Sequence, residues 1–135
     1  MKALYIVLLL CLTIILSACS GSGPEKSAET WFQAMATSDG TTALKLTCGT
    51  YKADIQNMGL LMGGINMLAG GMVSDAEVDT SSVTFETTAK SGDDATVRVS
   101  GTYIQGLMGA AFEQQVDANF IMVKEDGEWK WCGER

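Results

Sequence analysis

The sequence predicts an α+β domain in which N-terminal helices pack on one face of a four-stranded antiparallel sheet. Apolar residues recur at helical spacing between positions 28 and 55, and from Thr80 onward apolar and polar residues alternate with a period of two. Turn sequences rich in Gly and Asp separate the alternating segments, which indicates hairpins. Because the helices cannot bury their apolar stripes on each other alone, we expect them to cover one face of the sheet.

Composition excludes several classes of function. The 135-residue chain is the size of one small domain. It has no histidine, which excludes Ser-His-Asp and Cys-His catalytic centres and His-liganded zinc or haem. Its 16 acidic residues outnumber nine basic ones, which argues against a nucleic-acid surface. We therefore expect no metal, no cofactor and no nucleic-acid partner.

The N-terminus has the pattern of an export signal. Lys2 precedes an uncharged run at 3–16, which is shorter than the roughly 20 residues that span a bilayer. The sequence Leu-Ser-Ala-Cys at 16–19 resembles the lipobox of bacterial lipoproteins. This resemblance implies a diacylglyceryl group on the Cys19 thiol, cleavage before Cys19 and acylation of the new amino terminus, for example with palmitate. An uncleaved membrane anchor and an ordinary secretory cleavage remain the alternatives.

We accordingly expect three parts: a lipoprotein signal peptide at 1–18, a lipid-anchored tether at 19–23 and one α+β domain at 24–135. The lipid on Cys19 would hold the protein at the cell membrane or the outer membrane, with the domain facing the periplasm or the cell exterior. Two or three acyl chains hold a protein almost permanently, whereas one binds only marginally.

The first helix is expected to begin at Pro24, since proline suits the first helical turn, and to end at the Ser-Asp-Gly sequence at 38–40. Ser22 and Glu25 have the spacing of a capping box. The apolar stripe of this helix consists of Ala28, Trp31, Phe32 and Met35.

A second helical stretch is expected from about Thr41. Its apolar residues can share one face, and Gly49 favours a break in the middle because glycine weakens a helix by roughly 1 kcal/mol relative to alanine. The residues of that face are Leu44, Cys48, Tyr51 and Ile55.

Residues 58–73 form an uncharged segment that holds five of the 15 glycines and four of the eight methionines. Three interpretations remain open. The segment is a buried helix or loop whose methionines fill gaps in the core, a ligand lid or partner surface, or a part that dips into the membrane.

Four strands follow. The strand from 116 is apolar on both faces in its second half, so we expect it to be central or covered. Turns are expected at 91–94 and at 125–127, where Asp-Gly is a strong hairpin signal. The expected strands are 83–88, 97–103, 116–123 and 129–131.

This order of elements resembles the cystatin-like superfamily, and in particular small bacterial lipoproteins with a fold like that of nuclear transport factor 2. Three features carry the resemblance: the aromatic helix at 24–35, the helix restart at Asp39-Gly40, and the closing hairpin at 120–131 with its Asp-Gly-x-Trp sequence. The resemblance covers roughly residues 24–132, and the segment at 58–73 departs from it.

The resemblance implies a curved sheet wrapped around the helices with an apolar pocket between them. Candidate pocket residues are Trp31, Met35, Tyr51, Phe85, Tyr103 and Phe120. Enzymatic relatives of the isomerase and dehydratase type place Asp, Tyr or His in that pocket. Tyr51, Asp54 and Tyr103 are the candidates here, although tyrosines commonly serve as half-buried packing residues and Asp54 is expected to face water. No catalytic motif matches residue by residue.

Two cysteines remain in the expected mature domain if Cys11 leaves with the signal peptide and Cys19 carries lipid. An exported domain favours a disulfide between Cys48 and Cys132. One objection is that strand alternation places Cys132 opposite Trp129 and Trp131. Two free buried thiols, or a redox or metal role, are the alternatives.

We therefore expect a lipid-anchored envelope protein that acts as a non-enzymatic binding or structural module. Its partners would be the membrane, through Cys19, and an envelope protein or an apolar ligand. The alternative is an enzyme of the ketosteroid isomerase or dehydratase type that uses a pocket carboxylate or tyrosine.

Overall fold

The computed structural model describes residues 23–68, 77–107 and 110–135. The expected signal peptide at 1–18, the expected anchor Cys19 and residues 69–73 of the glycine- and methionine-rich segment lie outside the described residues.

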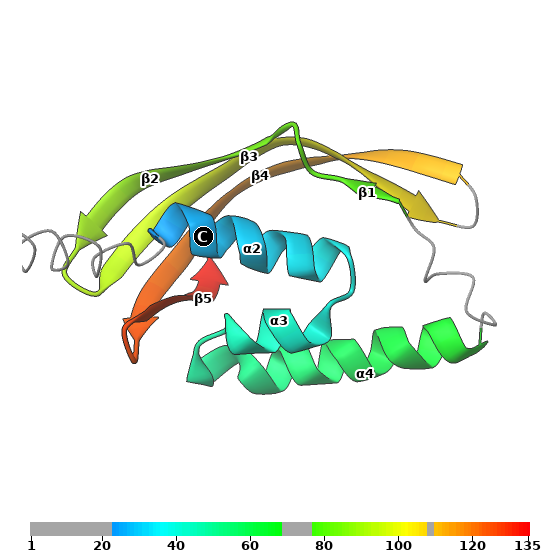
Figure 1. The fold of residues 1–135 in the computed structure, drawn as a ribbon, viewed down its shortest axis with the longest axis horizontal. Helices are drawn as coiled ribbons and strands as arrows, with labels where there is room; N and C mark the ends of the chain where they lie inside the picture. Colours follow the sequence, from blue (N-terminus) through cyan, green and yellow to red (C-terminus); the bar gives the residue numbers. More distant parts are fainter. Residues whose placement is uncertain (1–22, 69–76, 108–109) are drawn as a thin grey trace, which may run out of the picture.

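The domain is an α+β fold, as predicted, in which helices precede a curved antiparallel sheet (Figure 1). Helix α2 (Pro24–Ala36) lies next to the concave face of the sheet and contacts the neighbouring strands. Helices α3 (Gly40–Lys45) and α4 (Lys52–Leu68) lie farther from the sheet, and the 3-10 turn η2 (Gly49–Tyr51) connects them. Helix α2 is therefore the main cover of the sheet.

The start of α2 differs from the prediction. The N-cap residue is Gly23, so the expected capping box between Ser22 and Glu25 is wrong. The Glu25 carboxylate instead accepts a hydrogen bond from the Thr87 hydroxyl on strand β2 (Val83–Ser91). A capping box needs its first residue at the N-cap; with the helix starting one residue later, Glu25 is free to hold the helix to the sheet.

The break predicted near Gly49 is confirmed, and it has a structural role. Residues 46–48 leave the helical path and run parallel to strand β5 (Glu128–Glu134). The Trp131 amide donates to the Leu46 carbonyl at 2.7 Å, and the Cys48 amide donates to the Trp131 carbonyl at 2.9 Å. Residues 46–48 thus cover the outer edge of the last strand.

Helix α4 continues through the glycine- and methionine-rich segment as far as Leu68. The interpretation of this segment as buried is wrong where side chains are described, because Met58, Leu60 and Leu61 are 48%, 76% and 64% exposed. The apolar composition of α4 predicted burial. The helix instead lies on the outer side of the domain, where it contacts mainly α3 and η2.

The sheet of the described residues has five strands, not the four predicted. The additional strand is β1 (Val78–Asp79), which pairs with the far end of β3 (Asp94–Leu107). Two residues are too few to show an alternating pattern, so sequence periodicity could not reveal this strand. Strand β2 pairs with the other half of β3 on the same side.

Strand β4 (Ala110–Glu125) lies between β3 and β5, as predicted from its apolar second half. The Asp126-Gly127 hairpin then returns the chain into β5, with positive φ angles of 53° and 80° at these two residues.

Gly101 allows the close approach between β3 and the chain at the start of β2. Its φ is 136°, and a Cβ at this position would overlap the Ser82 carbonyl oxygen and lie 3.0 Å from the Val83 Cα. Only glycine adopts such a conformation without strain. Gly101 is thus required where the edge changes from β1 to β2.

The core lies between α2 and the half of the sheet near β5. Trp31 of α2 stacks on Trp131 of β5 with ring centroids 4.2 Å apart, and it meets Phe120 of β4 edge-on at 5.4 Å. Its indole nitrogen donates to the Thr47 hydroxyl at 2.9 Å. The fully buried aliphatic residues around this cluster are Val97, Val99 and Met122.

Cys48 and Cys132 form a disulfide bond, with their Cα atoms 5.3 Å apart. The objection from strand alternation does not apply, because the bond lies at the edge where residues 46–48 run beside β5, and Cys132 need not point into the core. Cys48 is fully buried there.

We expect Gly101→Ala to destabilise the domain by about 1–3 kcal/mol through backbone strain, with an added cost from the overlap with Ser82. Urea unfolding of a chain that begins at residue 19 and carries Cys19→Ser measures this. Gly59→Ala is the matched control: it lies in a helix with open space around it, and we expect it to stabilise the domain by roughly 0.5–1 kcal/mol. Equal effects of both substitutions would contradict the role of Gly101.

We expect the Cys48→Ala/Cys132→Ala double variant to lose about 4–5 kcal/mol, because the disulfide closes a loop with a sequence separation of 84. Urea unfolding with and without dithiothreitol tests this. Reductant should lower the stability of the parent and leave the double variant unchanged. Thiol labelling of both cysteines in the non-reduced parent would contradict the bond.

Candidate functional site

A small apolar cleft opens between the end of α2 and the first half of α4. Its volume is about 150 Å³. Ile55, Met58 and Gly59 contribute from α4, where spacings of three and four residues place them on one side of the helix. The other lining residues are Ala34, Met35, Ser38, Gly40 and Gln105.

Phe112 of β4 extends this apolar region along the concave face of the sheet. It pairs with Gln105 of β3, which lines the cleft, and directly paired residues of antiparallel strands lie on the same face. Phe112 is 47% exposed. An aromatic ring left half uncovered beside a cleft is available to an apolar partner.

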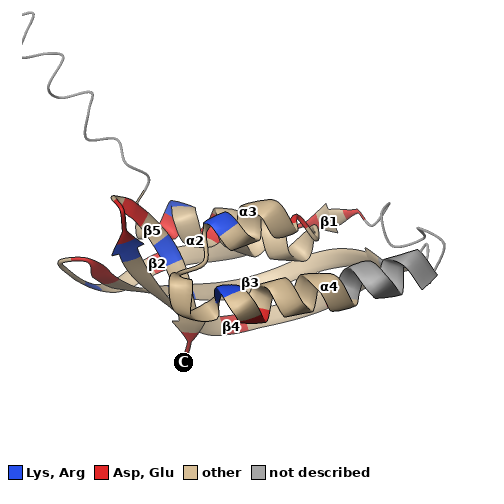
Figure 2. Ribbon diagram, turned by 90° about the horizontal axis from the view of Figure 1, so that it is seen from below, with Lys and Arg blue, Asp and Glu red and all other residues tan. Residues whose placement is uncertain are grey.

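The part of α4 after its first turn adds exposed apolar side chains, which point to more than one side of the helix. We define the α4 surface as Met58, Leu60 and Leu61; Leu60 is 76% and Leu61 64% exposed. The charged residues of this helix, Lys52 and Asp54, lie in its first turn, and Figure 2 shows the following described part of α4 without charge. Exposed large apolar side chains on a stretch of helix without charge are a feature of interaction sites.

A larger, polar pocket of about 380 Å³ lies on the other side of α2. Its lining residues are Thr30, Gln33, Ala34, Thr37, Asp39, Thr42, Val78 and Thr80. Most of them offer only hydroxyl or amide groups, and Asp39 is occupied as the N-cap of α3, where its carboxylate accepts from the Thr42 amide at 3.1 Å. Hydrogen bonding is therefore the chemistry that this pocket offers.

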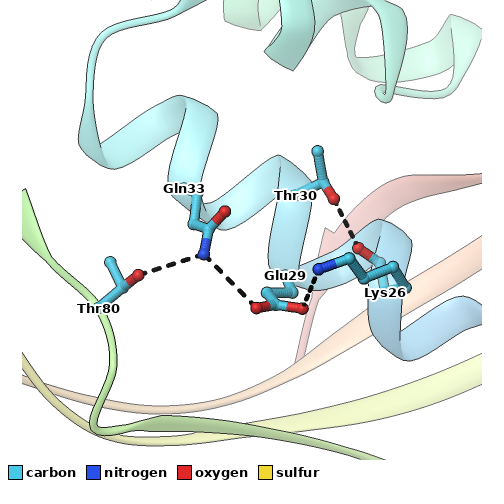
Figure 3. A network of polar contacts seen from close by, with 5 residues as sticks. All are labelled: Lys26, Glu29, Thr30, Gln33 and Thr80. Carbon is cyan, nitrogen blue, oxygen red and sulfur yellow. Dashed lines mark hydrogen bonds and ion pairs between the residues drawn. The ribbon is translucent and has the colours of Figure 1, made fainter.

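A network along α2 ties the pocket rim together (Figure 3). The Gln33 amide nitrogen reaches both Glu29, at 3.5 Å, and the Thr80 hydroxyl, at 3.4 Å. Lys26 forms an ion pair with Glu29 at 2.8 Å, and the Thr30 hydroxyl donates to the Lys26 carbonyl. These groups satisfy one another, which suits a structural link between α2 and the β1–β2 connection.

Three carboxyl groups have a pKa below its ordinary value, and hydrogen bonds are the cause in each case. The Thr87 hydroxyl lowers the pKa of Glu25, hydrogen bonds from Thr42 lower that of Asp39, and hydrogen bonds from Ser81 lower that of Asp79. A carboxylate held ionised in this way is a poor general acid at neutral pH.

Five of the six expected pocket residues contribute to aromatic packing. Phe32 packs against both Phe85 and Tyr103, whose ring centroids lie 5.8 and 5.3 Å from that of Phe32. Tyr51 packs edge-on against Trp131 at 5.3 Å, and its ring lies against Gly133. Trp31 and Phe120 belong to the same core. These rings pack against one another between α2 and the sheet.

Met35 is the expected pocket residue that does line the cleft. The candidate catalytic residue Asp54 is exposed on the first turn of α4, as predicted. The structure does not bring Tyr51, Asp54 and Tyr103 together around either of the two pockets described above.

Sequence reasoning missed Ile55 and Gln105 as cleft residues, and Phe112 as the exposed aromatic residue beside the cleft. Phe112 lies outside the strand expected at 116–123, since the residues on either side of it are alanine and glutamate and show no clear alternation. The uncharged run from Met58 was a usable signal, and it indicated a partner surface as one of its three interpretations.

Comparison of the chain with protein-family models, curated proteins and solved structures gives no match. No helix within the described residues is long and apolar enough to cross a membrane. Within the same residues, no group of three His, Cys, Asp or Glu side chains is placed to hold a metal ion.

Proposed function

We propose that this chain is a lipid-anchored envelope protein whose cystatin-like domain is a non-enzymatic binding module for an apolar segment of another envelope protein. The observation that carries the proposal is the exposed α4 surface of Met58, Leu60 and Leu61 beside the cleft. A buried core helix would explain the apolar composition of α4, but these side chains face solvent. A partner that covers them removes apolar area from water.

The size of the cleft favours a protein segment over a small apolar ligand. Small-molecule sites usually have volumes of about 300–1,000 Å³, and this cleft has about 150 Å³. That volume suits one or two side chains of a partner helix or strand. The open α4 surface would contact the rest of the segment.

The anchor is proposed from residues 16–19 and from the export signal before them. The tether at 19–23 is short, so the domain would stay close to the membrane surface. The cystatin-like assignment is supported by the curved sheet around α2 and by the closing hairpin of β4 and β5.

No specific observation favours the isomerase or dehydratase alternative. Tyr51 and Tyr103 are engaged in aromatic packing. Asp39, the carboxylate at the polar pocket, has a lowered pKa because it caps α3. We therefore propose no catalytic residue.

The anchor is tested by Cys19→Ser in the full-length protein. We expect the parent to incorporate labelled palmitate and to fractionate with membranes, and the variant to lose both properties. Cys11→Ser is the matched control and should retain both. Palmitate incorporation that persists in Cys19→Ser would contradict the anchor.

The binding surface is tested by site-specific photo-crosslinking in intact cells that make the protein. We expect a photoreactive residue at Leu61 to give a discrete adduct with another protein, because this side chain lies on the α4 surface. The matched control is Thr88 on β2, which is also exposed but has no apolar neighbours of this kind.

The adduct at Leu61 should disappear in a Met58→Glu/Leu60→Glu background, because charge on the α4 surface opposes apolar contact. Adducts of equal yield at both positions, or adducts with lipid alone at Leu61, would contradict a protein partner at this surface.

A further inference from the structure

One half of β4 has an outer edge without a strand partner within the described residues. Strand β5 pairs with β4 over Phe120–Glu125 only, and the Arg135 amide donates a hydrogen bond to the Asn119 carbonyl. On the other side, β3 pairs with β4 continuously from Asp94 to Leu107. We define the free β4 edge as residues 110–118.

The free β4 edge has two acidic residues, Glu113 and Asp117, but lacks the other usual features that prevent pairing with another strand. Edges are commonly protected by proline, by charged side chains, above all lysine, or by bulges. Residues 110–118 contain no proline and no lysine, and their register with β3 is unbroken. Residues 110–115 are all exposed. An open, regular edge of this length is a template for a further strand.

We propose that two copies of this chain pair through their free β4 edges, antiparallel, about a two-fold axis at Gln114. In this register all nine residues of the edge pair, with Gln114 opposite its own copy. Phe112 faces Val116 of the second copy on the concave side. Such a contact is isologous and closes as a dimer.

Charge selects this register over its neighbours. About Gln114, Glu113 lies opposite Gln115 and Asp117 lies opposite Ala111, so neither acid meets an acid. A shift of the axis to Glu113 places this residue opposite itself, and a shift to Gln115 places Glu113 opposite Asp117. Like charges directly opposite each other destabilise a strand pair. The register that uses the whole edge is therefore also the one without acid–acid pairs.

The second copy is also favoured by the apolar residues of the edge. Phe112 is 47% exposed in the single chain, and an aromatic residue opposite a β-branched one is a stabilising cross-strand pair. A nine-residue pair spans about 30 Å. The axis is perpendicular to the sheet, so the concave faces of both copies lie on the same side.

Disulfide crosslinking in native membranes tests the register. We expect Gln114→Cys in the full-length lipoprotein to form a covalent dimer under mild oxidation, because paired Cβ atoms lie about 4.5–5.5 Å apart. Two matched controls should stay monomeric: Gln105→Cys, on the adjacent strand β3, and Thr88→Cys, on the opposite edge strand β2. No dimer at Gln114 above the Thr88 level, or a covalent adduct with a different protein, overturns the proposal.

A charge exchange at the axis provides an independent measurement. We expect Gln114→Lys and Gln114→Glu each to raise the dimer dissociation constant about tenfold or more in sedimentation experiments, because each places two like charges opposite each other. An equimolar mixture of the two variants should regain the dimer, since Lys then faces Glu. A mixture that remains as monomeric as its components overturns the proposal. Regain by mixing also shows that both variants are folded.

Discussion

The stack of Trp31 on Trp131 is the interaction on which the rest of the domain depends. It joins the first helix to the last strand, and the two tryptophans are 100 positions apart in the sequence. The same indole of Trp31 donates to Thr47, whose hydroxyl in turn donates to the Ala43 carbonyl at the end of α3. The backbone of Trp131 forms hydrogen bonds with residues 46–48 at the edge of β5, beside the disulfide. One aromatic pair therefore positions α2, α3 and β5 together.

This concentration of contacts leaves the domain asymmetric. The half of the sheet near β5 is covered by α2, by the aromatic core and by residues 46–48. In the other half, β3 and β4 continue beyond α2, and Phe112 and Ile104 remain exposed on opposite faces. The cleft and the free β4 edge both belong to this second half. The well-packed half thus supports a half whose apolar groups and backbone edge are available for contacts.

The sequence predicted the parts of the fold in which local pattern and tertiary packing agree. The stripe of Ala28 and Trp31 faces the core as its period indicates, and the hairpins follow from Asp-Gly turns and alternation. Prediction failed where the surroundings decide. Composition cannot tell whether Leu60 is covered, because burial of α4 depends on how far it lies from the sheet. The two-residue strand β1 and the close approach at Gly101 arise from the path of the chain between two strands, which leaves no periodic signal.

The candidate site shows the same division between local and tertiary information. The sequence identified the aromatic residues, but it could not show that Phe32 and Trp31 would fill the space between helix and sheet with rings packed edge-on and stacked. The remaining apolar surface is at the margin, on α4 and β4, where a second protein chain can add either a side chain or a strand. These exposed groups lie where the tertiary surroundings, and not the local sequence, decide which apolar side chains are covered.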